Sequence, residues 1–186
     1  MLPKLELIVG NVAINPVSGS LTDHYDPRNQ TVNLSQTVYG ENSIAALAVA
    51  CHECGHAIQH SKNYGLLKFR NTLVPVANLT SNISWPLAIV GIILLGAGNM
   101  NLGNLLFMIG VGFFGIAVLF HLVTLPVELN ASSRALKQMV ECNLIDDDEK
   151  RGARKVLKAA ALTYVAALAT ALANMLRLIA MRNRNR

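Results

Sequence analysis

The sequence predicts a mainly α-helical integral membrane protein with a small N-terminal β element, and three observations lead to this class. Hydrophobic residues make up 52% of the 186 residues and charged residues only 15%, so the mean hydropathy of +0.38 is high for a soluble protein. Residues 102–127 carry no charged side chain and are long enough to cross a hydrocarbon layer that requires ~20 apolar residues. Short apolar and β-branched runs alternate with turn signals in residues 1–41.

These first 41 residues are expected to form a small sheet. The strand candidates are LELIV (5–9), VAI (12–14) and TVNLS (31–35), and the turn candidates are NPVSGS (15–20) and DHYDPRNQ (23–30). We expect TVNLS to lie at an edge of the sheet, where an extended peptide could bind by backbone pairing.

A helix and a membrane hairpin are expected next. Ser43 is a plausible N-cap for a helix over residues 44–60, because Ile44 and the apolar residues that follow it form one face. Residues 84–98 and 102–127 are separated by only three residues, Asn-Met-Asn. The two apolar segments therefore read as a pair of membrane helices joined by a tight turn.

Two more helices are expected towards the C-terminus. Pro126 is suited to the first turn of a new helix, which would stop near the acidic residues 146–150. That acidic run, DDDEK, is most simply a solvated loop. The Ala-rich residues 159–176 form a weaker third membrane span.

The predicted organisation has four segments. They are the β element with the first helix (1–71), the transmembrane hairpin (72–125), a helix with the acidic loop (126–158), and the C-terminal membrane helix with its basic tail (159–186).

The distribution of basic residues predicts the orientation in the membrane. Residues 1–80 and 126–158 would share one face, and together they hold twelve of the sixteen Lys and Arg residues. The positive-inside rule assigns that face to the cytoplasm, so we expect a multi-pass protein of the cell membrane, surrounded by the lipid bilayer. The basic residues are dispersed and have no aromatic residues between them, so no nucleic-acid partner is expected.

The segment CHECGHAIQH (51–60) contains a candidate zinc site. His52 and His56 fall about 40° apart on a helix and one turn apart along it, so both imidazoles can reach one ion. Glu53 lies about 60° round from His56, where it can touch a water on the metal without binding the metal. Zinc leaves one position open for water in such sites and lowers the pKa of that water to about 7, and the carboxylate serves as general base.

The third ligand decides between this site and a chance match. Metzincins place another His six residues after the second, where this chain has Lys62. His60 lies about 12 Å from His52 along a straight helix, which is too far to share one ion. Glu128 is the best remaining candidate because it is the only acidic residue between Glu53 and Glu141. An acid in the first turn of a helix, favoured by the helix dipole, is the alternative role for Glu128.

Four separated motifs resemble a known family. They are LTDHYDPRNQTVNLS, SIAALAVACHECGHAIQH, LVPVANLTSNISWPL and LPVELNASSRAL, in that order between about Gly19 and Ala167. Together they resemble the bacterial membrane family of neutral zinc metallopeptidases of the YugP type. HECGH followed much later by VELNASSRA is also similar to the gluzincin arrangement, in which a second helix supplies a glutamate.

The resemblance implies a gluzincin-like HExxH helix and a membrane-embedded zinc metallopeptidase. It implies one Zn²⁺ ion held by His52, His56 and Glu128, with Glu53 as the catalytic base, and a peptide or protein substrate. The resemblance implies a further membrane helix at the start of family members, which we expect this chain to lack. The gluzincin pattern also has an Asp where this chain has Ser132.

Several other residues are candidates for supporting roles. Asn130 or Ser132 could steady a metal-bound His in place of that Asp. His60 could line the cleft near Glu53 or be a solvated residue at the end of its helix. His121 lies in an apolar span, where an ionisable residue suggests a function, although it could equally reach towards the membrane interface.

His24 and Tyr25 could bind substrate or stabilise an oxyanion, although turn chemistry around them explains the same stretch. Cys51 and Cys54 form a C-x-x-C, which is better read as two small buried residues than as redox or thiolate ligands.

Two functions from other classes compete with the peptidase. One is a non-catalytic zinc-binding membrane scaffold or adaptor, which would keep the metal without turnover. The other is a small transporter, which His121 suggests. Glu53→Gln separates them, because only the peptidase needs that carboxylate while the metal stays bound.

Overall fold

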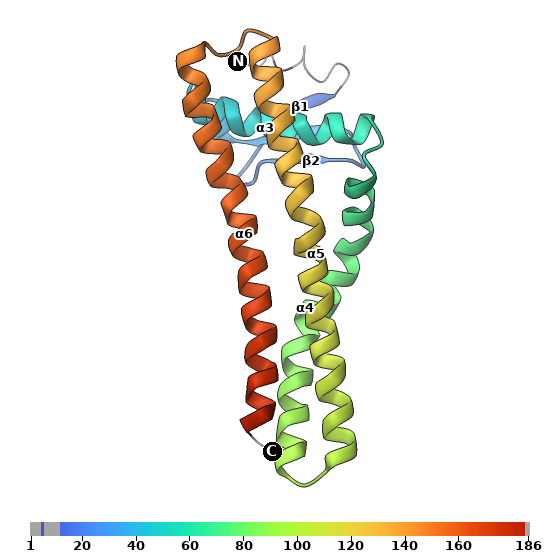
Figure 1. The fold of residues 1–186 in the computed structure, drawn as a ribbon. Coiled ribbons are helices and arrows are strands. Elements are labelled where there is room, and N and C mark those ends of the chain that lie inside the picture. The colour runs from blue at the N-terminus through green and yellow to red at the C-terminus, as the bar shows by residue number, and fades with distance from the viewer. Residues whose placement is uncertain (1–4, 6–11, 185–186) are drawn as a thin grey trace. The chain divides into compact units, whose positions relative to one another are not determined.

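The computed structural model describes Leu5 and residues 12–184 and is mainly helical (Figure 1). Its elements are β1 (Ala13–Val17), β2 (His24–Asp26), β3 (Thr31–Ser35), α2 (Gln36–Tyr39), α3 (Ile44–Ser61), α4 (Gly65–Gly96), α5 (Met100–Glu141) and α6 (Asp147–Arg184). The small N-terminal sheet and the long apolar helices confirm the predicted fold class.

The strand TVNLS is β3, and it is the central strand of the sheet. The strand order is β1-β3-β2, with β1 parallel and β2 antiparallel to β3. The prediction that TVNLS lies at an edge is therefore wrong. Val32 and Leu34 are both fully buried, which explains why this strand pairs on both sides. Among the described strands, β1 and β2 form the edges.

The turns lie later than the sequence suggested. Asn15 and Pro16 belong to β1 rather than to a turn, because an edge strand tolerates a proline that cannot donate to the ladder. The chain reverses after β1, where Gly19 has a φ of 103°. The predicted turn DHYDPRNQ likewise begins as β2. The candidate strand LELIV lies outside the described residues, apart from Leu5, and α2 was not predicted.

The predicted N-cap of α3 is confirmed. The Ser43 hydroxyl accepts a hydrogen bond from the Ala46 backbone N–H at 3.2 Å, which satisfies one of the free donors of the first turn. Cys51 and Cys54 lie on the buried face of the helix, where they pack in one apolar cluster with Ala135 and Met139 of α5. Burial raises the pKa of Cys54 to about 12, so these thiols behave as small apolar residues.

No new helix begins at Pro126. This proline lies inside α5, which runs unbroken from Met100 to Glu141. A proline within a helix removes the backbone hydrogen bond to the carbonyl four residues earlier, which here is that of Leu122.

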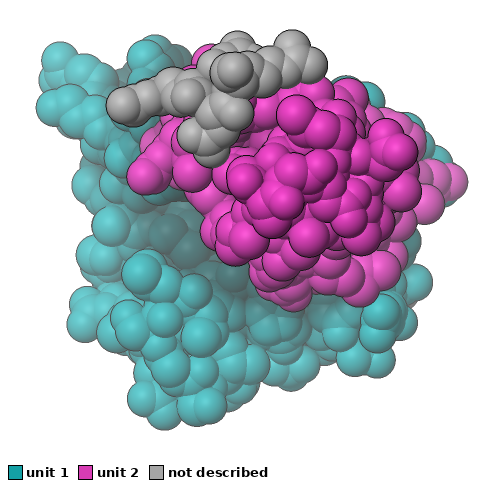
Figure 2. Space-filling view, turned by 90° about the horizontal axis from the view of Figure 1, so that it is seen from below, with its two compact units in different colours: residues 1–67, 126–163 teal, residues 68–125, 164–186 magenta. Residues whose placement is uncertain are grey.

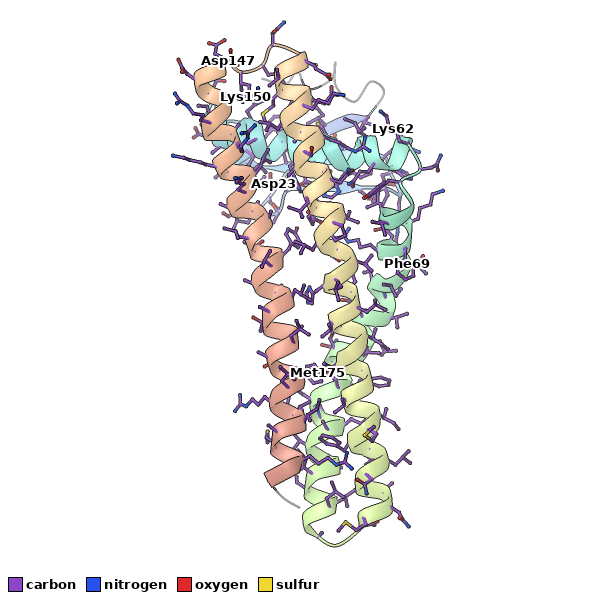
Figure 3. The ribbon with its side chains drawn as sticks, viewed as in Figure 1. Asp23, Lys62, Phe69, Asp147, Lys150 and Met175 are labelled. Carbon is purple, nitrogen blue, oxygen red and sulfur yellow. The ribbon has the colours of Figure 1, made fainter. Side chains whose placement is uncertain are left out.

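The acidic run is helical rather than a solvated loop. Residues 147–150 form the first turn of α6, and the Asp146 backbone N–H donates to the Glu149 carboxylate at 3.0 Å. Negative side chains in a first turn are stabilised by the helix dipole. Asp147 and Lys150 mark this turn in Figure 3, and Lys62 marks the C-terminal end of α3.

The chain forms two compact units, coloured separately in Figure 2. Unit 1 comprises residues 1–67 and 126–163, and unit 2 comprises residues 68–125 and 164–186. In unit 1, α3 packs against the sheet and against α5 through a core that includes Leu34, Ala48 and Met139.

Unit 2 consists of segments of the three long apolar helices. The helices Gly65–Gly96, Met100–Glu141 and Asp147–Arg182 are each long and apolar enough to cross a membrane. α4 and α5 approach closely, because a Cβ at Gly91 would lie 2.6 Å from the Phe107 backbone nitrogen. Small residues permit such close helix packing in membranes. Apolar side chains such as Phe69, which is 47% exposed, project outward (Figure 3).

Gly55 permits a similarly close approach in unit 1. A Cβ at this position would lie 2.5 Å from the Ala131 carbonyl oxygen on α5, and a backbone atom cannot move aside locally. We expect Gly55→Ala to push α3 and α5 apart and to lower the free energy of unfolding by about 1–3 kcal/mol, measured by thermal melting.

Gly112→Ala is the matched control, because a Cβ there would meet nothing within 4 Å. The same substitution should leave that variant as stable as the native protein or more stable by up to ~1 kcal/mol. Equal melting temperatures for the Gly55 variant and the native protein would contradict the close approach.

Candidate metal centre

α3 and α5 bring two histidines and a glutamate together in unit 1. His52 and His56 lie one turn apart on α3 with ring centroids 4.9 Å apart. The Nε2 atom of His52 is 3.1 Å from Glu128 Oε2, and the Nε2 atom of His56 is 3.4 Å from the same oxygen. One ligand atom from each residue lies within 4.8 Å of the others. The structure therefore brings the three predicted ligands together.

The chemistry of these donors fits a zinc ion. Two ligand atoms about 2.0–2.1 Å from a tetrahedral zinc lie roughly 3.3 Å apart, which matches both distances to Glu128. Two imidazoles and one carboxylate are a known ligand set for catalytic zinc and leave a fourth position open. Glu128 is only 2% exposed, and a buried carboxylate requires a cationic or hydrogen-bonding partner.

Glu53 lies beside this group, as predicted. Its side chain is buried, and burial raises the pKa of the carboxyl group above its ordinary value. The charges of His56 and His52 oppose that shift, and the Tyr25 backbone N–H donates a hydrogen bond to the carboxylate. β2 therefore contacts Glu53 directly.

The side chain of Tyr25 pairs with His60, near the C-terminal end of α3. The Tyr25 hydroxyl lies 2.8 Å from His60 Nδ1, so His60 is not a free helix-end residue, and it does not belong to the group of His52, His56 and Glu128. His24 is exposed and bonds to the Thr22 carbonyl and to Asn33. Its contacts favour the turn-chemistry role over substrate binding.

Other side chains contact the Nδ1 atoms of the two histidines, which are the ring nitrogens that do not face Glu128. The Ser132 hydroxyl lies 3.2 Å from His52 Nδ1, which is the supporting contact expected of Ser132. His56 Nδ1 lies 3.0 Å from Gln59 Oε1. Asn130 supports the site one step further out, because its side-chain oxygen accepts hydrogen bonds from Gln59 and from Arg134.

Gln59 and Arg134 were missed by the sequence analysis. Gln59 follows His56 by three residues, so helical spacing could have placed it on the same face. Arg134 follows Asn130 by four residues on α5, so the same helical spacing could have placed its guanidinium beside the Asn130 side chain.

His121 belongs to unit 2, whereas the metal group belongs to unit 1. Its ring contacts the adjacent Phe120, with centroids 5.6 Å apart. A role for His121 in the cleft stays a prediction.

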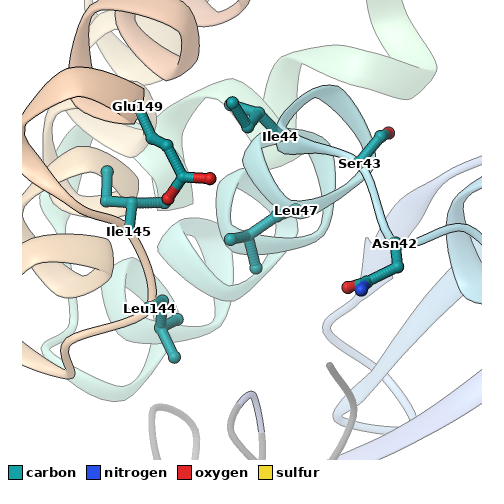
Figure 4. A pocket seen from close by; sticks show the side chains of 7 residues that line it. All are labelled: Asn42, Ser43, Ile44, Leu47, Leu144, Ile145 and Glu149. Atoms are coloured by element: carbon teal, nitrogen blue, oxygen red, sulfur yellow. The ribbon is translucent and has the colours of Figure 1, made fainter.

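A separate pocket of about 210 Å³ lies where α3 begins (Figure 4). Ile44 and Leu47 line one side, and Leu144, Ile145 and Glu149 line the other. None of the metal-group residues borders it, so this pocket is distinct from the metal centre.

Comparisons with known proteins identify the family of the chain. A family model described as "Putative neutral zinc metallopeptidase" matches residues 4–183. A curated Bacillus subtilis (strain 168) protein named "Putative membrane protease YugP" is 47% identical over 169 residues, which cover 91% of this chain and 72% of that protein. No solved structure matches the chain significantly. The chain therefore belongs to the neutral zinc metallopeptidase family that this model defines.

Proposed function

We propose that this protein is a membrane-embedded zinc endopeptidase that hydrolyses peptide bonds with Glu53 as general base. The observation that carries the proposal is the buried group of His52, His56 and Glu128 with Glu53 one residue along α3. The family and relative named above supply the reaction class. One zinc ion per chain is part of the proposal.

His52, His56 and Glu128 would bind the ion, and Glu53 would act as general base and then as general acid. Zinc in such a site acts as a Lewis acid on a peptide carbonyl and acidifies water. The Glu53 carboxylate is placed to take a proton from the attacking water and to give it to the leaving amine.

β2 supports binding of the substrate as an extended peptide. It is an edge strand of the described sheet, and its Tyr25 contacts the general base through the backbone. An added strand at such an edge gains backbone hydrogen bonds without demanding a particular sequence. This role belongs to β2 and not to the central β3.

The active site would face the cytoplasm. His52 and His56 lie in segment 1–80 and Glu128 lies in segment 126–158, and these two segments together hold twelve of the sixteen basic residues. This proposal rests on the positive-inside rule.

Removal of the metal tests the proposed activity. The purified protein should cleave a quenched fluorescent peptide library, lose that activity after treatment with 1,10-phenanthroline, and regain it when about one equivalent of zinc is added back. The scaffold alternative predicts bound zinc without cleavage in any of these states. Cleavage that persists in the metal-free protein would overturn the proposal.

A further inference from the structure

We propose that Gln59 is a positioning residue that keeps a proton on Nδ1 of His56. It does so through a series of hydrogen bonds, and Arg134 and the Val127 carbonyl set the direction of those bonds. This proposal rests on the proposed function, because it leaves Nε2 of His56, the ring nitrogen that faces Glu128, as the one that binds the metal. Nothing in the comparisons assigns a role to Gln59.

Gln59 is fully buried and makes three hydrogen bonds. Its Oε1 lies 3.0 Å from His56 Nδ1, and its Nε2 donates to the Val127 carbonyl at 2.8 Å and to Asn130 Oδ1 at 3.0 Å. The amide therefore connects a ligand on α3 with the backbone of α5 one residue before Glu128.

The direction of each bond follows from what its partner can do. A guanidinium group only donates, so Arg134 Nε, at 2.7 Å, requires an oxygen of Asn130. The Asn130 oxygen can only accept, so the Gln59 atom beside it must be the donor nitrogen Nε2. The Val127 carbonyl is also an acceptor, so it independently places the same nitrogen there. The Gln59 oxygen must then face His56, so His56 Nδ1 carries a proton, and Nε2 is the ring nitrogen left to face Glu128 and a metal ion.

The two histidines differ in this respect. His52 Nδ1 faces the Ser132 hydroxyl, which can donate or accept. Ser132 therefore leaves the tautomer of His52 open, whereas Gln59 determines that of His56. We expect His56 to be prepared for metal binding before the ion arrives.

The test measures tautomer and zinc affinity in the full-length protein in detergent. In the zinc-free native protein, ¹⁵N NMR of labelled histidine should show His56 protonated at Nδ1. Gln59→Met keeps the volume and removes the amide, so it should give mixed tautomers and raise the zinc dissociation constant about 10- to 100-fold in chelator competition. Gln138→Met, at a residue of α5 whose contact with Glu141 is exposed, is the matched control and should change neither quantity.

Gln59→Glu separates the bond that Gln59 accepts from His56 from the bonds that it donates to α5. Its carboxylate can still accept from His56 but cannot donate to Val127 or Asn130. We expect the Nδ1 proton to stay while the zinc affinity falls.

Should Gln59→Met fail to fold, Arg134→Met replaces it as the test, because Arg134 is half-buried and lies at the end of this series of hydrogen bonds. That variant removes one of the two constraints on the amide, so we expect a smaller loss of zinc affinity, about a few-fold. The Val127 carbonyl still holds the Gln59 nitrogen, so the Nδ1 proton should remain.

Two outcomes would overturn the inference. One is a His56 Nδ1 that carries no proton in the zinc-free native protein. The other is unchanged zinc affinity and tautomer in Gln59→Met. Failure of the native protein to bind zinc would instead refute the proposed function, and the tautomer measured without zinc would still decide the role of Gln59.

Discussion

Glu53→Gln is expected to reduce peptide cleavage by about 100-fold or more while the protein keeps its zinc. Glutamine has nearly the same shape as glutamate and can still accept a hydrogen bond from the Tyr25 backbone N–H, but it cannot take up a proton. The loss should appear in kcat, measured with the peptide substrate, and the zinc content should equal that of the native protein.

Glu41→Gln is the matched control for this change. Glu41 is exposed and precedes α3, outside the metal group, so the same substitution should leave cleavage and zinc content unchanged. Native activity in Glu53→Gln would refute the general base and would favour a scaffold that binds zinc without catalysis.

Glu128→Ala is expected to abolish stable zinc binding. The variant keeps both imidazoles but loses the only carboxylate of the group, and two protein ligands do not retain zinc against a chelator. The loss of affinity should exceed the about 10- to 100-fold that removal of an outer hydrogen-bond partner costs. Mass spectrometry of the metal content, after dialysis against a weak chelator, measures it.

Glu141→Ala provides the comparison, because Glu141 lies on the same helix but is exposed and pairs with Lys137 at 3.6 Å. Its zinc content should match that of the native protein. Equal zinc retention in the Glu128 and Glu141 variants would show that the third ligand has been misassigned.

The metal group could be predicted because its geometry is mostly local. Helical periodicity alone puts His52 and His56 on one face, and the structure has them on α3 as expected. Glu128 lies 76 residues from His52, and it could be named because no other acidic residue separates Glu53 from Glu141. The rarity of acids in apolar segments made a long-range contact predictable here.

Other features depend on tertiary contacts that no local pattern encodes. TVNLS reads equally well as an edge or a central strand, and only its pairing with β1 and β2 decides. Pro126 reads as a helix start because proline is favoured there, yet the apolar environment keeps α5 continuous through it. Helical spacing can place Gln59 on the face of His56, but its bonds to Val127 and Asn130 depend on how α5 packs against α3.

X-ray absorption at the zinc edge of the zinc-loaded protein tests the central claim most directly. We expect about one zinc per chain with two imidazole nitrogens at roughly 2.0–2.1 Å, carboxylate oxygen at about the same distance, and no sulfur. In Glu128→Ala that spectrum should be lost together with the metal. A sulfur shell near 2.3 Å would place the metal at cysteines instead, and a spectrum without two imidazoles would contradict the site at His52, His56 and Glu128.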